Sequence, residues 1–139
     1  MNCSYWTIAG GFALSLAFSA TALAQSTPKG GDPAAAKLQN PVASSPESVE
    51  KGKAIFMKKC VMCHGPKADG TPQIMIEGGV SPANLTETAY IYGTADGQIF
   101  SNIKNGILPN LNMPTWDGQI PDADIWNLVN FLRTVRQPG

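Results

Sequence analysis

The chain has 139 residues, of which ten are basic and ten acidic, so its formal net charge is zero. This length predicts a single folded domain, and the balanced charge argues against a nucleic-acid-binding protein or one that binds an anionic membrane surface. Charged residues make up only 14% of the chain, whereas 14 glycines and 11 prolines indicate a small, loop-rich fold, whose thin core needs reinforcement from disulfides, a metal or a cofactor.

The first predicted element is a secretory signal peptide at residues 1–24. This stretch contains no charged residue and ends in an A-x-A sequence at Ala24, which is the pattern of a cleavage site. The alternative is a retained membrane anchor, but the apolar run from Ile8 is shorter than the roughly 20 residues that a spanning helix needs. We therefore expect cleavage after Ala24, which would remove Cys3, and a periplasmic protein without stable membrane insertion.

Residues 25–43 are rich in Pro, Gly, Ala and Ser and show no apolar periodicity. Such a composition is typical of a flexible leader. The folded unit is therefore predicted to occupy residues 44–139.

The first predicted helix begins at Ser44 or Ser45. Ser44 and Glu47 fit the S-x-x-E capping box, and Pro46 would lie in the first turn, where its missing N–H does no harm. Four residues at spacings of three and four then form one helical face: Val49, Gly52, Phe56 and Cys60. A glycine inside a helix costs roughly 1 kcal/mol relative to alanine, so Gly52 on this face predicts that another helix approaches closely there.

Two further helices are predicted. In residues 94–107, the apolar side consists of Ile99, Phe100 and Ile103, and Gly106 supplies the stop. Within residues 121–139, apolar residues follow the i, i+3, i+4, i+7 spacing of an amphipathic helix: Ile125, Leu128, Val129 and Leu132.

The connecting loops, at residues 65–90 and 107–121, are long for so small a domain. A large apolar cofactor around which they wrap would explain their length. The sequence shows no alternating strand pattern and no internal repeat.

The residues best suited to chemistry are Cys60-Val61-Met62-Cys63-His64, which include the only histidine of the chain. A structural zinc site needs four ligands, and the predicted mature region offers no further Cys or His. A thioredoxin-type dithiol is expected at a helix start among strands, whereas this pair ends a helix. A disulfide across so small a loop would add little stability. Covalent haem attachment has the recognised spacing Cys-x-x-Cys-His, with each thiol forming a thioether and His64 serving as an axial ligand.

The sequence resembles class I c-type cytochromes over about residues 45–137. The resemblance rests on the Cys60–His64 motif, on Gly52 and Phe56 before it, on Met113-Pro114 after it, and on Leu128 and Phe131 in the final helix. It implies an all-α, small cytochrome c fold of three to five short helices, with long loops wrapped around one covalently bound haem. It also implies that the first and last helices cross, with these glycine, phenylalanine and leucine residues in contact.

A second axial ligand is expected among four methionines, since the chain has no second histidine: Met57, Met62, Met75 and Met113. Met57 and Met62 lie too close to the attachment motif to reach the opposite haem face, and Met75 follows His64 by only eleven residues. Met113 lies 49 residues after His64, and Pro114 follows it. The family carries its distal ligand in such a Met-Pro context, so we expect His64 and Met113 to be the iron ligands.

The resemblance also implies contacts around the haem. In the family, a proline carbonyl accepts a hydrogen bond from the other ring nitrogen of the axial histidine. Pro82 is the matching residue here, and Leu85 is expected to line the pocket. Four side chains are candidate donors to the haem propionates or to the Met113 sulfur: Trp116, Tyr90, Tyr92 and Asn112.

These features predict a periplasmic electron-transfer protein with one haem c rather than an enzyme. His/Met ligation raises the reduction potential, and a closed six-coordinate iron favours outer-sphere electron transfer. The expected partners are a redox protein that donates electrons and another that accepts them, such as a dehydrogenase, an oxidase or a reductase. Four lysines are candidates to flank the haem edge and attract acidic partners: Lys58, Lys59, Lys67 and Lys104.

Two other functions stay open. Residues 92–107 are similar to segments of cytochromes that accept electrons from quinoprotein alcohol or sugar dehydrogenases, which would make the chain a subunit of a dehydrogenase complex. The other is a haem enzyme or ligand sensor, in which Met113 dissociates from the iron.

Overall fold

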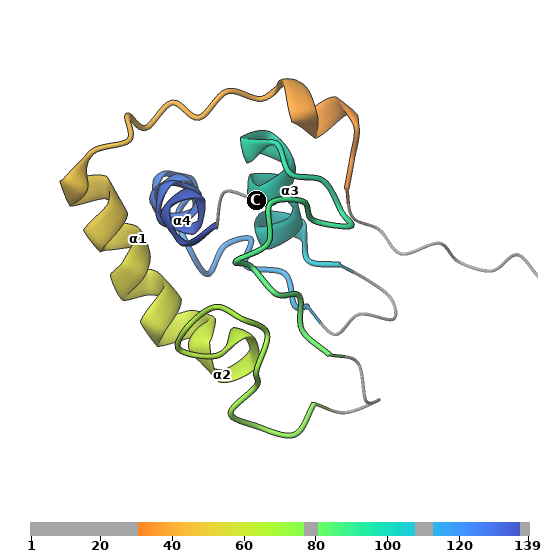
Figure 1. Ribbon diagram of the computed structural model, residues 1–139. Coiled ribbons are helices and arrows are strands. Elements are labelled where there is room, and N and C mark those ends of the chain that lie inside the picture. The colour runs from red at the N-terminus through yellow and green to blue at the C-terminus, as the bar shows by residue number, and fades with distance from the viewer. Residues whose placement is uncertain (1–30, 77–80, 108–112, 137–139) are drawn as a thin grey trace, which may run out of the picture.

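This computed structural model describes residues 31–76, 81–107 and 113–136. They form a short 3-10 helix, η1 (Ala34–Lys37), and four α-helices: α1 (Pro46–Lys59), α2 (Val61–His64), α3 (Asp96–Asn105) and α4 (Asp122–Val135) (Figure 1). Within these ranges no strand forms, only an isolated bridge between Ile107 and Met113, and the all-α prediction is confirmed. No helix in this part is both long and apolar enough to span a bilayer. The predicted signal peptide and Asn112 lie outside the described residues.

Helix α1 begins where the sequence predicted, but Ser45 rather than Ser44 caps it. The Ser45 hydroxyl accepts a hydrogen bond from the Ser48 N–H (3.2 Å), and Pro46 is the first helical residue. The capping oxygen therefore lies one residue further along the chain than the predicted capping box requires.

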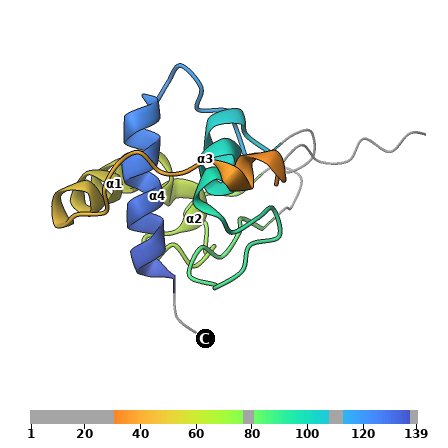
Figure 2. The same cartoon turned by 90° about the horizontal axis from the view of Figure 1, so that it is seen from above.

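Helices α1 and α4 cross. Figure 1 shows α4 end-on while α1 runs across the view, and Figure 2 shows α4 along its length. The helices are in close contact because Gly52 has no side chain, and a Cβ at this position would overlap the Asn127 carbonyl oxygen. Phe56 packs on Phe131, with ring centroids 5.4 Å apart. The predicted crossing and the close approach at Gly52 are confirmed.

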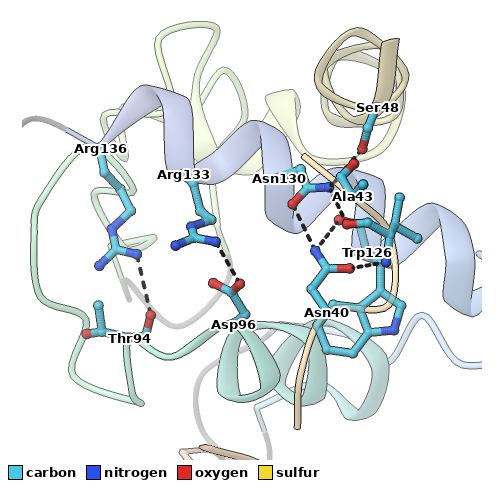
Figure 3. Close-up of polar contacts among 10 residues, drawn as sticks. Asn40, Ala43, Ser48, Thr94, Asp96, Trp126, Asn130, Arg133 and Arg136 are labelled. Carbon is cyan, nitrogen blue, oxygen red and sulfur yellow. Dashed lines mark hydrogen bonds and ion pairs between the residues drawn. The ribbon is translucent and has the colours of Figure 1, made fainter. Parts of the chain in front are cut away.

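A buried polar network fixes how α1 and α4 meet (Figure 3). The Ser48 hydroxyl donates to Asn127 Oδ1 (2.7 Å), and Asn130 Nδ2 donates to Ser48 Oγ (2.8 Å). Asn130 is only 1% exposed. Because a buried polar group left without a partner costs about 1–3 kcal/mol, this network disfavours any other register of the two helices.

Residues 31–43 differ from the expected flexible leader because they are fastened to the helices. Asn40 Nδ2 donates to Asn130 Oδ1 (2.9 Å) and to the Trp126 carbonyl (3.3 Å) on α4 (Figure 3). Asn130 Nδ2 in turn lies 3.2 Å from the Val42 carbonyl oxygen. The C-terminal half of the segment is therefore bound to the same asparagine that joins α1 to α4.

The N-terminal half of this segment is held by α3. The Gly31 N–H donates to Asn102 Oδ1 (2.8 Å). Ala35 of η1 is buried, and its backbone contacts Gly97, where a side chain would not fit. Small residues and single hydrogen bonds, rather than large apolar side chains, hold this part of the chain in place.

Helix α4 lies between α1 and α3 (Figure 1). Phe100 stacks on Trp126 with ring centroids 4.1 Å apart, and Arg133 forms an ion pair with Asp96 (3.0 Å; Figure 3). Gly106, with a φ of 71°, ends α3. The two later helices therefore form where the sequence predicted them, and their apolar faces are buried.

Candidate functional site

One cavity of about 490 Å³ gathers the residues that the sequence analysis singled out. Its volume lies in the roughly 300–1,000 Å³ range of small-molecule and cofactor sites, and its lining is mainly apolar, as in such sites. All seven predicted site residues line it: Cys60, Cys63, His64, Pro82, Leu85, Met113 and Trp116. The fold thus brings together at one cavity residues that are far apart in the sequence.

The turn after α1 presents the two thiols. Helix α1 ends at Lys59, and the Cys60 carbonyl then accepts hydrogen bonds from the Cys63 N–H (3.2 Å) and the His64 N–H (2.9 Å). Gly65 ends this turn at a φ of 76°, a backbone conformation that glycine adopts most easily. Both cysteines are free thiols, and one turn of chain brings them and the imidazole to the same cavity.

The Cys60 thiol lacks the lowered pKa that is expected of a thiol in a redox-active pair. Burial, helped by the neighbouring Cys63, raises the pKa of Cys60 to about 12. A dithiol oxidoreductase needs the opposite, a lowered thiol pKa that yields the thiolate near neutral pH. The dithiol alternative therefore gains no support. In the described ranges, no group of three or more His, Cys, Asp or Glu side chains could hold a metal ion.

The His64 ring is oriented by a backbone carbonyl. Its Nδ1 lies 3.1 Å from the Ala83 carbonyl oxygen, and because a carbonyl only accepts, Nδ1 carries the hydrogen. Nε2 is then the nitrogen with a lone pair for a metal. Burial lowers the pKa of His64, and the hydrogen bond to Ala83 partly offsets this shift. The neutral, metal-binding form of the ring is therefore favoured.

Pro82 lines the cavity, but its carbonyl is not the acceptor, contrary to the prediction. That carbonyl faces Gly70, where a Cβ would lie only 2.7 Å from the oxygen. The next carbonyl, that of Ala83, faces His64 instead. The sequence signal that could have indicated this is that Ala83 separates Pro82 from Asn84, whereas in the family segment matched to Pro82 the proline directly precedes the asparagine.

Met113 is the methionine that faces the cavity. Its carbonyl accepts a hydrogen bond from the Ile107 N–H (3.0 Å), and its side chain packs against the buried core. None of the other three candidate methionines, all within the described ranges, lines the cavity. Met75 is 98% exposed, and Met57 and Met62 are about half exposed. Met113 is thus the thioether available to a group bound in this cavity.

The candidate donors around the cavity have different roles. The Tyr90 hydroxyl donates to the Leu85 carbonyl (2.6 Å) and so closes a loop of the cavity wall. Its only hydrogen is therefore used within the protein, and Tyr90 does not have the predicted role of a donor to a haem propionate or to the Met113 sulfur. Tyr92 lines the cavity, and its carbonyl accepts a hydrogen bond from Asn102 Nδ2 (2.9 Å). Asn102 also lines the cavity, which no sequence pattern indicated.

The four candidate lysines also differ. Lys59 lines the cavity, and its Nζ lies 5.6 Å from the centre of the Trp116 ring. Lys104 Nζ is bonded to both Asp122 carboxylate oxygens (2.8 Å each), which raises the pKa of Lys104. Its charge is therefore paired within the protein and contributes little to attracting a partner. Lys58 and Lys67 are exposed.

The donor set fits a covalently held haem. Two free thiols one turn apart, an imidazole with Nε2 available and a methionine thioether all face one mainly apolar cavity. Thiols next to a histidine are the attachment groups of haem c, and histidine with methionine is the axial ligand pair of c-type electron carriers.

Comparisons with known proteins agree with this assignment of the fold. The family described as cytochrome c oxidase, cbb3-type, subunit III matches residues 47–132. The cbb3-type cytochrome c oxidase subunit FixP of Bradyrhizobium sp. (strain ORS 278) is 34% identical over 84 residues, which cover 60% of this chain and 26% of that protein. The match thus spans about a quarter of that relative's length.

Solved structures share the fold at low sequence identity. A chain of the reducing HAO-like protein complex of Kuenenia stuttgartiensis aligns with a TM-score of 0.64 at 20% identity, over 73% of this chain and 49% of that one. Cytochrome cL of Methylophaga aminisulfidivorans aligns with a TM-score of 0.53 at 22% identity, over 66% of this chain and 57% of that one. At these identities the likeness concerns the fold alone.

Proposed function

This chain belongs to the family described as cytochrome c oxidase, cbb3-type, subunit III, a family of class I c-type cytochromes, and we propose that it transfers electrons by means of one covalently bound haem c. In this proposal, Cys60 and Cys63 would hold the haem through thioether bonds, and His64 and Met113 would coordinate its iron. The haem would supply the one-electron chemistry.

The observation that carries the proposal is the convergence of these four residues on one cavity. A Cys-x-x-Cys-His motif attaches haem covalently, and with both His64 and Met113 bound to its iron no coordination position would remain for a substrate. This arrangement favours electron transfer over catalysis at the iron.

The surrounding residues suit an electron carrier. The Ala83 carbonyl fixes the orientation and tautomer of His64. The thioether of Met113 is a soft ligand, which favours reduced iron and raises the reduction potential. The mainly apolar wall, which includes Leu85 and Trp116, restricts the access of water and so also tunes the potential.

The proposed partners are a redox protein that donates electrons and one that accepts them. An oxidase complex is the favoured acceptor because a relative of this chain is named as a subunit of one. Lys59 and Trp116 both line the cavity, so docking is expected on their side, through the small and weak kind of interface that electron-transfer partners use. Export directed by residues 1–24 would place the protein in the periplasm.

The expected behaviour of the purified holoprotein is that of a closed, reversible one-electron centre. Potentiometric titration should follow a single transition with about 59 mV per tenfold change in the ratio of oxidised to reduced protein. Carbon monoxide should bind the reduced protein slowly at neutral pH, because Met113 must first leave the iron. Rapid binding would instead support a ligand sensor or haem enzyme, and stable co-purification with a dehydrogenase would support a subunit of that complex.

A further inference from the structure

The C-terminal turn of α3 holds the segment that follows Met113. The last carbonyls of a helix have no partner within it, and that of Lys104 is used by this segment. It accepts hydrogen bonds from Thr115 Oγ1 (2.7 Å), from the Asp117 N–H (2.9 Å) and from the Trp116 N–H (3.1 Å). Three consecutive residues after Pro114 are thus bonded to one carbonyl of α3.

Met113 itself is held against the same end of α3. Its carbonyl accepts a hydrogen bond from the Ile107 N–H (3.0 Å). At Gly106 the backbones come so close that a Cβ would lie 2.7 Å from the Met113 carbonyl oxygen and 2.8 Å from the Thr115 nitrogen. The ion pair between Lys104 and Asp122 joins this turn of α3 to the start of α4. The backbone around Met113 is therefore anchored to the C-terminal end of α3, which is itself joined to α4 by this ion pair.

Thr115 makes its contact with α3 through its side chain. Its hydroxyl donates to the Lys104 carbonyl and accepts a hydrogen bond from the Asp117 N–H (3.2 Å). The side chain is exposed, and Thr115 is not among the described residues that line the cavity. It can therefore affect a group in the cavity only through the backbone that it shares with Met113.

We propose that Thr115 is a positioning residue that keeps Met113 in the cavity and so sets how often the methionine leaves the iron. The inference rests on the proposed function, in which Met113 is the second axial ligand. When the methionine leaves, its segment moves away from α3, and the hydrogen bond between Thr115 and Lys104 breaks. This bond stabilises the closed state relative to the open one, and its removal raises the fraction of open molecules.

The test compares three variants of the holoprotein with the wild type: Thr115→Val, Thr115→Ser and Thr134→Val. Valine keeps the branched shape of threonine without the hydroxyl, and serine keeps the hydroxyl. Thr134 is the matched control, because its hydroxyl also donates to a backbone carbonyl, that of Phe131, at 2.7 Å, but it lies on α4. The measurements are the rate of carbon monoxide binding to the reduced protein, the near-infrared methionine–iron band of the oxidised protein on heating, and the midpoint of thermal unfolding.

Thr115→Val is expected to bind carbon monoxide about threefold to tenfold faster than the wild type, the change in open population that the loss of one hydrogen bond produces. Its methionine–iron band should also disappear at a lower temperature. Thr115→Ser and Thr134→Val should bind carbon monoxide at the wild-type rate, although Thr134→Val lowers the unfolding midpoint as Thr115→Val does. A general loss of stability would not produce this difference between the two valine variants.

Equal binding rates in Thr115→Val and Thr134→Val would overturn the inference and leave the proposed function intact, as long as the wild type shows the methionine–iron band. A wild type without that band would refute ligation by Met113, and with it both the positioning role and the proposed axial pair.

Discussion

Replacing Met113 by alanine is expected to remove the near-infrared methionine–iron band of the oxidised protein and to lower its reduction potential. The thioether favours reduced iron, and the axial ligands set haem potentials over a range of about 0.8 V, so we expect a decrease on the order of 0.1 V. The vacated position should also let carbon monoxide bind rapidly. Near-infrared absorption and potentiometric titration of Met113→Ala measure these changes.

Met75→Ala is the matched control. Met75 is the other methionine that follows His64 in the chain, and it is 98% exposed and does not line the cavity. This variant should keep both the band and the potential of the wild type. A band that persists in Met113→Ala, or that disappears in Met75→Ala, would show that the axial ligand has been misassigned.

Gly52→Ala is expected to destabilise the protein by about 1–3 kcal/mol and to lower the midpoint of thermal unfolding by roughly 5–15 °C. The added Cβ would overlap the Asn127 carbonyl oxygen, so α4 must move away from α1. That movement also disturbs the packing of Phe56 on Phe131. Thermal or denaturant unfolding of the holoprotein measures the loss.

Ala54→Gly in the same helix is the control for this result, because Ala54 is exposed. Helix propensity alone would make Gly52→Ala stabilising and Ala54→Gly destabilising, each by roughly 1 kcal/mol. If the close contact between α1 and α4 at Gly52 outweighs helix propensity, both variants are less stable than the wild type. A more stable Gly52→Ala protein would mean that α1 and α4 do not approach closely at this residue.

The parts of the site that could be predicted depend on local patterns. Cys60, Cys63 and His64 are adjacent in the chain, so a single helical turn brings them to one place whatever the rest of the fold does. The periodic apolar faces of the last two helices likewise predicted their burial. Gly52 could be interpreted because its cost inside a helix needs a compensating contact.

The partner of His64 could not be predicted in the same way. It depends on how two loops meet, and the close contact between Gly70 and the Pro82 carbonyl turns the next carbonyl, that of Ala83, toward the ring. A shift of one residue in a loop changes which carbonyl points toward the ring. Such a shift does not alter the periodic pattern of apolar residues in the sequence.

The ordered segment at residues 31–43 was missed for a related reason. Its composition predicted flexibility, yet Asn40 is bonded to Asn130, 90 positions away. The contact of Thr115 with Lys104 is of the same kind. Single hydrogen bonds between polar groups far apart in the sequence follow no periodic pattern, so the sequence pattern does not predict them.

The covalent attachment of one haem at Cys60 and Cys63 underlies the proposed function, and mass spectrometry of a tryptic digest of the holoprotein decides it. Cleavage after Lys59 and after Lys67 releases residues 60–67, which contain both cysteines and His64. We expect this peptide to carry the added mass of one haem, and no other peptide to carry any. An unmodified peptide, with its thiols free or joined to each other, from protein produced in a host that matures c-type cytochromes would contradict haem attachment at this site.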